Sequence, residues 1–331
     1  MRVLITGGAG FIGSHLVDRY LAQGDEVVVV DDFSTGSPLN LAHHDTPNLR
    51  IVRGKVEDGA VLEEAFVGID LVYHLAAAVG VFEILRRPLE SLRTNLDATE
   101  AIFERAMRSD VRTVFTSTSE VYGKNGKASL SETDDSIYGP TTASRWLYAV
   151  SKATDEFLAL ANHREYGFPV SIVRLFNTTG PRQTGAYGMV VPRFVQQALA
   201  GLPLTVFGDG NQTRCFTNVH DTVEALVRIG RTPASIGRVV NVGQPDEITI
   251  LDLATRIREI AGSSSPIQHV PYSVAYEPGF EDMRRRVPDV TLLRELIDYA
   301  PDTPLETTIG QIMASTREAL ADSLVSSPAK P

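Results

Sequence analysis

The chain begins Met1-Arg2-Val3-Leu4-Ile5-Thr6-Gly7-Gly8-Ala9-Gly10-Phe11-Ile12-Gly13, a short apolar strand that runs into a glycine-rich turn. A helical run follows, and Glu26 to Val30 reads as a second apolar strand that ends in Asp31. In such a strand–turn–helix unit Gly7 allows the tight turn, Gly10 lets a pyrophosphate approach the backbone, and Gly13 lets the helix pack closely against the strand. The stretch therefore predicts the first βαβ unit of a dinucleotide-binding fold.

The two ends of this unit indicate the cofactor. A pyrophosphate would lie at the N-terminus of the helix that begins near Phe11, where free N–H groups and the helix dipole favour an anion. Asp31 lies about 20 residues further on, and its carboxylate can bind a ribose diol but would repel a 2′-phosphate. The sequence therefore predicts NAD rather than NADP. A glycine-rich surface turn without a ligand is the alternative.

Composition limits the partners. The 331 residues carry 41 acidic and 31 basic side chains, a formal net charge of −10. The length suggests one large or two modest domains, and the acidic balance argues against a nucleic acid partner. Cys215 is the single cysteine, which excludes a disulfide framework, and the scattered histidines predict no metal site. No apolar run is long enough to cross a membrane, and the first strand leaves no room for a signal peptide. We therefore expect a cytoplasmic protein.

Strands and helices alternate after the first unit. Strands are expected at 50–53, 71–74, 112–116 and 170–175, and helices at 60–66, 88–107 and 145–166. This alternation predicts an α/β fold, a doubly wound parallel Rossmann sheet with right-handed crossovers. Because ligands bind at the carboxyl ends of such strands, the loops after Ile5, His74, Thr116 and Leu175 should face one crevice.

Two domains and a tail are expected. Glycine and proline crowd into the residues after Asn177, and the regular alternation stops there until a strand at 239–242 rejoins the sheet. We expect a Rossmann domain that binds NAD, a smaller, interrupted C-terminal domain that binds the substrate, and a tail whose composition is typical of disorder. The expected ranges are 1–178 with 215–243 for the first domain, 179–214 with 244–318 for the second, and 319–331 for the tail.

Tyr148 and Lys152 are the first candidates for catalysis. Residues four apart share one face of a helix, so the hydroxyl and the ammonium can lie together. A free tyrosine has a pKa near 10, but a neighbouring Lys⁺ and a positive nicotinamide ring favour phenolate. Tyr148 could then take a proton from a sugar hydroxyl, with Thr118 bridging the two. A surface Tyr/Lys pair is the alternative.

Over about residues 1–318 the chain resembles the extended short-chain dehydrogenase/reductases of the nucleotide-sugar epimerase/dehydratase/decarboxylase superfamily. Besides the glycine turn and Tyr148/Lys152, the resemblance rests on Asp31-Asp32-Phe33, Asp58, His74-Leu75-Ala76-Ala77, Ser117 to Gly123, Arg174 to Arg182 and Gly208 to Arg214. It implies NAD as cofactor and a UDP-sugar as substrate. The implied cofactor-binding residues are Gly7, Gly10, Phe11, Ile12, Gly13, Asp31, Asp32, Ser34, Thr35, Gly36, Asp58, Leu75, Ala76, Ala77, Asn95, Tyr148 and Lys152.

The resemblance also implies a substrate site. Asp58 would meet the adenine amino group of the cofactor, Asn177 and Arg214 would contact the sugar diphosphate, and the segment from Leu204 to Phe207 would border the uracil. The implied substrate-binding residues are Arg145, Asn177, Arg182, Val191, Thr205, Phe207, Arg214 and Arg286.

Within the superfamily, Thr118-Ser119-Glu120 resembles the UDP-glucuronate decarboxylases, and so do Ser144 to Lys152 and Arg286-Val287-Pro288-Asp289. The implied reaction is NAD-dependent oxidation at C4 of UDP-glucuronate, followed by decarboxylation to UDP-xylose and/or UDP-4-keto-xylose. Arg145 or Arg286 would hold the carboxylate by bidentate contact, and Glu120 would handle the proton at C5. The implied catalytic residues are Tyr148, Lys152, Thr118, Glu120 and Ser119.

Several alternatives remain open. The segment from Ala77 to Glu83 does not resemble the matching loop of the usual decarboxylases, which keeps a UDP-sugar 4-epimerase open, of UDP-glucuronate or UDP-glucose/galactose type, with a transient C4 ketone. A non-catalytic NAD-binding scaffold should lack the Tyr148/Lys152 pair. Glu120 could instead cap a turn, and Arg286 could belong to a solvated basic face.

The resemblance also implies a homodimer. The helices at 88–107 and 145–166 are similar to a pair that forms a dimer interface in this superfamily. On the first helix, apolar residues recur at helical spacing, facing either a partner or the sheet. These residues are Leu89, Leu92, Leu96 and Phe103.

Overall fold

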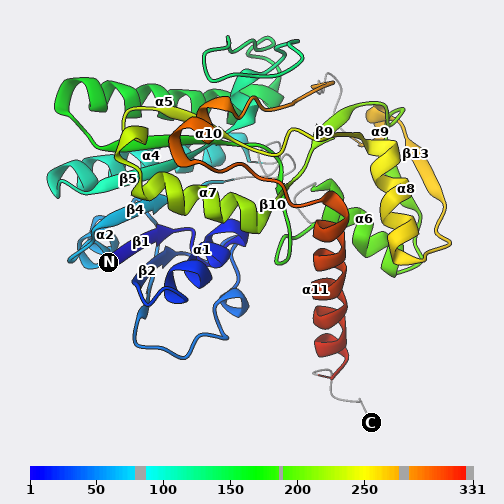
Figure 1. Cartoon of the computed structure of the whole chain (residues 1–331), viewed down its shortest axis with the longest axis horizontal. Coiled ribbons are helices and arrows are strands. Elements are labelled where there is room, and N and C mark those ends of the chain that lie inside the picture. The colour runs from blue at the N-terminus through cyan, green and yellow to red at the C-terminus, as the bar shows by residue number, and fades with distance from the viewer. Residues whose placement is uncertain (79–86, 186–188, 276–282, 326–331) are drawn as a thin grey trace.

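A parallel sheet of seven strands, in the order β11-β6-β5-β4-β1-β2-β3, forms the centre of the molecule (Figure 1). The computed structural model describes residues 1–78, 87–185, 189–275 and 283–325. All neighbouring strands in the sheet run parallel, and β1 lies between β2 and β4, as in doubly wound sheets. The predicted α/β fold is therefore confirmed.

The elements of this larger domain have the following bounds. The sheet comprises β1 (Arg2–Thr6), β2 (Glu26–Asp31), β3 (Leu49–Arg53), β4 (Leu71–His74), β5 (Arg112–Thr118), β6 (Val170–Leu175) and β11 (Val239–Val242). The flanking helices are α1 (Phe11–Leu21), α2 (Gly59–Ala65), α4 (Pro88–Arg108), α5 (Leu147–Tyr166), α7 (Val219–Arg231) and α10 (Thr291–Ile297). Single 3-10 turns are η1 (Pro38–Asn40), η2 (Ser119–Tyr122), η3 (Ser144–Trp146) and η4 (Pro233–Ser235).

Helices cover both faces of the sheet. Successive side chains of a strand point to opposite faces, so Val3 joins one core cluster and Leu4 the other. The first cluster contains residues of α1, α7 and α10, such as Leu226. The second contains residues of α2, α4 and α5, such as Ile102. Burial on both faces explains why the inner strands read as continuous apolar runs.

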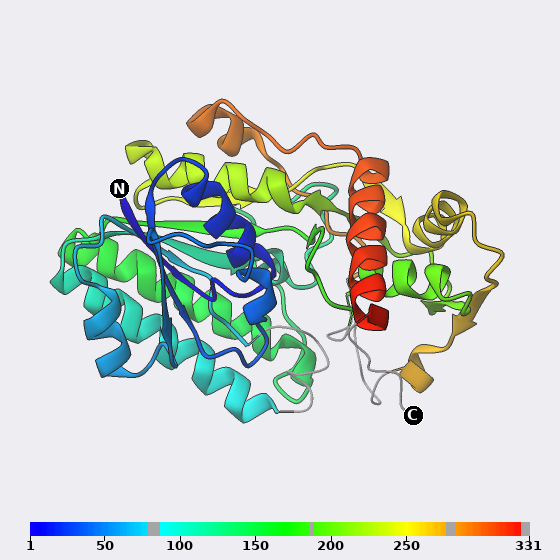
Figure 2. The same cartoon turned by 90° about the horizontal axis from the view of Figure 1, so that it is seen from below.

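The smaller domain is built on short strand pairs. Strand β8 (Leu204–Phe207) runs parallel to β13 (Ile267–Val270), and β9 (Thr213–Cys215) runs antiparallel to β12 (Glu247–Thr249). Its core lies between α6 (Val190–Leu199), α8 (Ile250–Ala261) and α11 (Leu305–Val325), and α11 stands between the sheet domain and the other two helices (Figure 2). The remaining elements are α9 (Tyr272–Ala275) and the parallel pair β7 (Thr178–Thr179) and β10 (Thr217–Asn218).

The observed division of the chain differs from the predicted one in two places. The sequence places 244–318 in the smaller domain, whereas Leu293 and Ile297 of α10 pack in the core of the sheet domain with α7. The tail predicted to be disordered from residue 319 is wrong over 319–325, because those residues continue α11. The rest of that tail, and most of the unusual segment ending at Glu83, lie outside the described residues.

The apolar stripe predicted on α4 divides between two environments. Phe103 is buried, with ring centres of Phe115 and Phe168 at 5.5 and 5.3 Å, so it faces the sheet. Leu89, by contrast, is 61% exposed. Within the described ranges, no helix, α4 and α11 included, combines the length and the apolarity that crossing a bilayer requires.

The glycine turn after β1 has no room for side chains. Gly7 has a φ of +69°, and a Cβ there would lie 2.9 Å from the amide nitrogen of Ala76. A Cβ on Gly13 would lie 2.1 Å from the carbonyl oxygen of Gly7. Both neighbours are backbone atoms, which cannot swing aside. The tight turn and the close helix packing predicted for these two glycines are therefore present.

Gly13→Ala should destabilise the protein, because α1 must move away from the turn to admit a methyl group. We expect a loss of about 1–3 kcal/mol or more, typical of an overpacked core, seen as a lower midpoint in thermal unfolding. Gly59→Ala is the matched control: it lies in α2 with nothing within 4 Å of the added Cβ. An unchanged midpoint for Gly13→Ala would contradict the packing described here.

Candidate active site

A cavity of about 930 Å³ lies at the carboxyl ends of the sheet strands and extends to the smaller domain. The loops after β1, β4, β5 and β6 all contribute to its lining, as the sequence predicts. The opposite wall comes from the smaller domain. The predicted site residues on the lining are Gly7, Gly10, Phe11, Ile12, Gly13, Asp31, Asp32, Ser34, Thr35, Leu75, Ala76, Ala77, Thr118, Ser119, Glu120, Arg145, Tyr148, Lys152, Asn177, Arg182, Val191, Phe207, Arg214 and Arg286.

The part of the cavity beside the glycine turn fits a dinucleotide. Helix α1 begins there after Gly10, which supplies no side-chain cap, so the first N–H groups of the helix are left for an anion. The carboxylate of Asp31 accepts hydrogen bonds from the amides of Ala9 (2.9 Å) and Phe33 (2.8 Å), one on each oxygen. Each oxygen keeps a lone pair for a ribose hydroxyl. These groups fit the pyrophosphate and the adenosine ribose of NAD.

Four predicted site residues do not line the cavity. Asp58 caps α2 by accepting a hydrogen bond from the amide of Ala60 (2.9 Å), and its neighbours Val56 and Glu57 face the cavity instead. Asn95 is buried and holds the loop after β4, accepting from the amide of Ala78 at 2.7 Å. The other two are Gly36, packed on Ala9, and Thr205, which is bonded to Gln197.

Tyr148 and Lys152 lie in the first turns of α5, with Thr118 at the end of β5. The ammonium of Lys152 is nearly buried and lies 4.3 Å from the centre of the Phe115 ring. Burial, together with the negative charges of Glu120 and Asp155, raises the pKa of the Tyr148 hydroxyl. The lowered pKa that the sequence analysis expects is therefore absent here. Activating Tyr148 requires positive charge brought beside its oxygen.

Glu120 is the centre of a buried charge cluster. Nη1 of Arg145 lies 2.5 Å from one carboxylate oxygen, and Nη1 of Arg286 contacts the other. Burial alone would raise the pKa of Glu120, but the guanidinium groups of Arg286 and Arg145 lower it to about 2. Glu120 is therefore ionised at all ordinary pH values. Arg286 is 7% exposed, so it does not belong to a solvated basic face.

Backbone contacts hold this cluster in place. Thr118 caps the turn η2 by accepting a hydrogen bond from the amide of Glu120 (3.2 Å), so the capping residue is Thr118 and not Glu120. The segment carrying Arg286 pairs with Leu130 through two backbone bonds of 2.9 Å, from Leu130 to Val287 and from Asp289 to Leu130. Asn241 on β11 then donates to the carbonyls of Leu130 and Asp289. The main sheet thus positions Arg286.

Asn177, Arg214 and Arg182, which line the cavity, each have a partner within the protein. The amide oxygen of Asn177 accepts from Arg286, and its nitrogen donates to the carbonyl of Cys215 at 2.9 Å. Arg214 donates to the carbonyl of Thr213 at 2.7 Å. Arg182 forms an ion pair of 2.8 Å with Asp18 of α1.

Asp18 also takes part in a cluster with potential metal ligands. Its other oxygen lies 3.1 Å from Nε2 of His43 and 2.7 Å from Nε2 of His44. The guanidinium of Arg182 already neutralises this carboxylate, which opposes the binding of a further cation. The predicted absence of a metal stays a prediction.

Sequence reasoning misses part of the lining. Arg193 of α6 lies over the Phe207 ring, 4.2 Å from its centre, and donates to the carbonyl of Thr205 (3.1 Å). A single arginine on an amphipathic helix gives no signal of such a role. Gln212 donates to the carbonyl of Phe207 at 3.0 Å, and its place inside the segment from Gly208 to Arg214 is a signal that could have identified it. Tyr272 also lines this wall.

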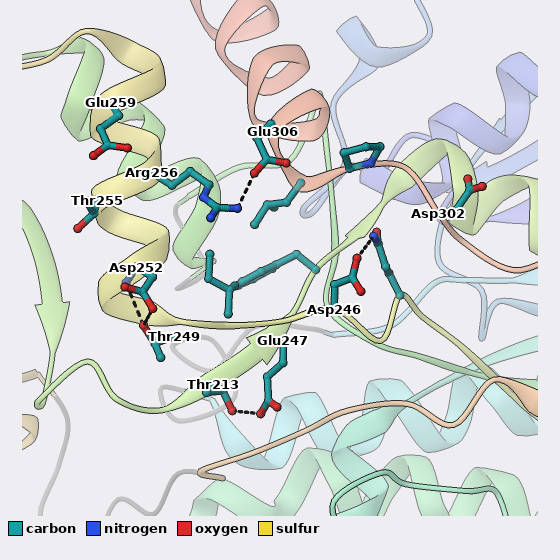
Figure 3. A pocket seen from close by; sticks show the side chains of 15 residues that line it. Thr213, Asp246, Glu247, Thr249, Asp252, Thr255, Arg256, Glu259, Asp302 and Glu306 are labelled. Carbon is teal, nitrogen blue, oxygen red and sulfur yellow. Dashed lines mark hydrogen bonds and ion pairs between the residues drawn. The ribbon is translucent and has the colours of Figure 1, made fainter.

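A second cavity, of about 610 Å³, lies beside α8 and the start of α11 (Figure 3). Acidic side chains dominate it, but Glu306 is paired with Arg256 at 2.5 Å, and Glu247 is paired with Arg285 at 2.8 Å. None of the predicted site residues lines this cavity. The candidate active site is therefore the larger cavity at the sheet.

Comparison with known proteins agrees with this geometry. A UDP-N-acetyl-alpha-D-glucosaminuronate decarboxylase of Bacillus cytotoxicus is 41% identical over 320 residues, 96% of this chain and 98% of that protein. UDP-glucuronic acid decarboxylase 4 of Arabidopsis thaliana is 39% identical over 306 residues, 92% of this chain and 66% of that longer protein. The UDP-glucuronic acid 4-epimerase of Bacillus cereus, solved with UDP-glucuronic acid and NAD, is 28% identical, with a TM-score of 0.86 over 96% of this chain and all of that one.

The glycine turn, Asp31, Tyr148 and Lys152 all lie within the part of the chain that matches a known family. Residues 3–243 match the NAD dependent epimerase/dehydratase family, and the relatives above extend the likeness over nearly the whole chain. The chain belongs to the NAD dependent epimerase/dehydratase family.

Proposed function

We propose that the chain catalyses NAD-dependent oxidation at C4 of UDP-glucuronate, followed by decarboxylation to UDP-xylose and/or UDP-4-keto-xylose. The observation that carries this proposal is the pair of buried guanidinium groups, Arg145 and Arg286, in the same cavity as Tyr148. A carboxylate at C6 offers these guanidinium groups an anionic partner on the sugar ring, which a neutral hexose lacks. The names of the decarboxylase relatives support the same reaction.

The first step requires a base at the C4 hydroxyl. Bound NAD⁺ supplies the hydride acceptor and a positive ring. Tyr148 takes the hydroxyl proton. Lys152 positions Tyr148, and Thr118 positions the C4 hydroxyl of the sugar. Since burial raises the pKa of Tyr148, the positive charge beside the phenol is what makes it a base at neutral pH.

The second step follows from the chemistry of the substrate. Once C4 is a ketone, the C6 carboxylate is β to it, and CO₂ can leave as the electrons of the C5–C6 bond flow into an enolate. Protonation at C5 then gives UDP-4-keto-xylose, and returning the hydride to C4 gives UDP-xylose. Arg145 and Arg286 orient the carboxylate, and the hydroxyls of Tyr148 and Thr118 stabilise the enolate oxygen. Each arginine also contacts Glu120. The carboxylate of the substrate and that of Glu120 therefore share the two arginines.

The charge state of Glu120 defines its role. With a pKa of about 2, its carboxylate does not release a proton of its own at neutral pH. It can orient a water molecule that relays a proton from solvent to C5, and it holds the two arginines while the substrate is absent. The proposed role of Glu120 is therefore to position this water and the two arginines.

The comparisons support one alternative substrate and one alternative reaction. The relative at 41% identity is named for the 2-acetamido sugar UDP-N-acetyl-alpha-D-glucosaminuronate, so this uronate is a second candidate for the same reaction. A 4-epimerase reaction would use the same C4 oxidation, and a structural relative is named for it. The decarboxylase names among the curated relatives make it the less favoured outcome.

The product distinguishes these reactions. We expect incubation with UDP-glucuronate or its 2-acetamido analogue to give a product whose mass is lower by one CO₂, measured by mass spectrometry and NMR. An unchanged mass with a moved C4 proton signal would mean epimerisation. Turnover of UDP-glucose or UDP-galactose alone would refute both uronate reactions.

Tyr148→Phe and Glu120→Gln should separate the two steps. Tyr148→Phe removes the base that C4 oxidation needs, so NADH should form about 10²–10⁴-fold more slowly. Glu120→Gln should still form NADH in a single turnover but complete the later steps, protonation at C5 among them, more slowly. Full turnover by Glu120→Gln would show that this carboxylate has no part in the later steps and would favour epimerisation.

We further propose a homodimer that forms through α4 and α5. In support, Val150 and Phe157, two turns apart on α5, are 43% and 72% exposed, and Leu89 is exposed on α4. Apolar side chains exposed together in this way are typical of an interface.

Light scattering should therefore give twice the chain mass at micromolar concentration. Phe157→Lys should shift the mass towards the monomer, because it places a charge inside the interface. The exposed Glu165→Lys on the same helix is the control. A monomeric wild-type protein would end this proposal.

A further inference from the structure

One buried carboxylate beside the candidate base remains unexplained. Asp155 is fully buried, and its carboxylate lies 3.5 Å from the ammonium of Lys152. Among the described residues, neither of its oxygens has a well-formed hydrogen bond, and the ammonium of Lys152 and the hydroxyl of Thr99 are the groups that lower its pKa. Burial acts more strongly in the other direction and raises the pKa of Asp155 to about 6, so the buried carboxylate is ionised at neutral pH.

The spacing along α5 aligns three side chains. Tyr148, Lys152 and Asp155 follow at i, i+4 and i+7, which places them in one row on the helix. The row runs from the cavity, which Tyr148 and Lys152 line, into the interior, where Asp155 has no contact with solvent. Asp155 is thus behind the lysine, on the side away from the substrate.

The other titratable groups near Lys152 are either neutral or paired with another residue. His74, at the end of β4, is neutral, because burial lowers its pKa to about 3. Glu156 is bound by Arg174 of β6, with bonds of 2.7 and 3.0 Å, and accepts a hydrogen bond from Ser117. The remaining carboxylate at Lys152 is that of Asp155.

The negative charges near Tyr148 also differ in whether an arginine neutralises them. The pair of arginines neutralises Glu120, whereas the charge of Asp155 has only its contact with Lys152 to offset it among the described ion pairs. Among the described residues, Asp155 is the acid whose charge acts on both Tyr148 and Lys152, and unlike Glu120 and Glu156 it has no ion pair with an arginine.

We propose that Asp155 is a positioning residue: its buried carboxylate holds the Lys152 ammonium charged and in place, and thereby sets the pH range in which the Tyr148/Lys152 pair works. This inference rests on the proposed function only for the role of Tyr148 as the base at C4. It does not depend on whether CO₂ is lost afterwards.

The sign of the effect follows from the charges. A negative charge at Asp155 raises the pKa of Tyr148 and opposes the lowering that burial imposes on Lys152. Removing that charge should lower both pKa values. The rate rises with pH as Tyr148 loses its proton and falls as Lys152 loses its own, so both limbs of the profile should move to lower pH.

The test is the pH dependence of NADH formation in a single turnover, with whichever UDP-sugar the wild-type enzyme oxidises. We expect Asp155→Asn to shift both limbs by ~1 pH unit or more, as for a charge removed at such close range. Glu165→Gln removes the same charge from an exposed position on the same helix, and its profile should superimpose on that of the wild type.

Two further outcomes keep the test decisive. A wild-type profile for Asp155→Asn, at full or reduced rate, would overturn the proposal, because a purely structural role lowers the rate without moving the limbs. If Asp155→Asn does not fold, Asp155→Ala removes the charge without leaving a buried amide and should give the same shift. A product that keeps its CO₂ would refute the proposed decarboxylation and leave this result intact.

Discussion

The site depends on one shared carboxylate. Glu120 binds Arg145, which precedes α5, and Arg286, which precedes α10. Removing one partner of a buried ion pair costs about 3–5 kcal/mol, so each of the three segments stabilises the positions of the other two. The cluster therefore couples the loop after β5, the start of α5 and the segment beyond α8. It also keeps two guanidinium groups ready for an anionic substrate.

Helix α5 serves two purposes with neighbouring acids. Adjacent residues on a helix point in different directions. Glu156 reaches Arg174 and ties the helix to β6, whereas Asp155 faces Lys152. The first pair is satisfied by several hydrogen bonds and holds the scaffold. The second is an ion pair at the active site, and the charge of Asp155 there acts on the pKa values of Tyr148 and Lys152.

Local patterns explain why much of this could be predicted. The strands at 170–175 and 239–242 are short segments rich in valine and other β-formers, and the glycine turn requires a backbone conformation that other residues rarely adopt. Tyr148, Lys152 and Glu120 stand out by spacing and resemblance. What could not be predicted is long-range: the sequence gives no sign that α10 packs on α7, or that Arg286 meets Glu120 because Leu130 and Asn241 hold its segment. The raised pKa of Tyr148 likewise depends on burial, which only the folded chain defines.

The position of β11 has a consequence for the synthesis of the chain. When residues up to Leu175 have left the ribosome, β6 is an apolar edge strand with one row of unpaired N–H and C=O groups, a template for pairing with other chains. Its proper neighbour, Val239–Val242, is made only after α6, β8, β9 and α7. Closing such a long loop slows folding, and α10 covers β11 later still. The nascent chain is thus prone to aggregation until its C-terminal third emerges, and a protein truncated after β6 would retain that exposed edge permanently.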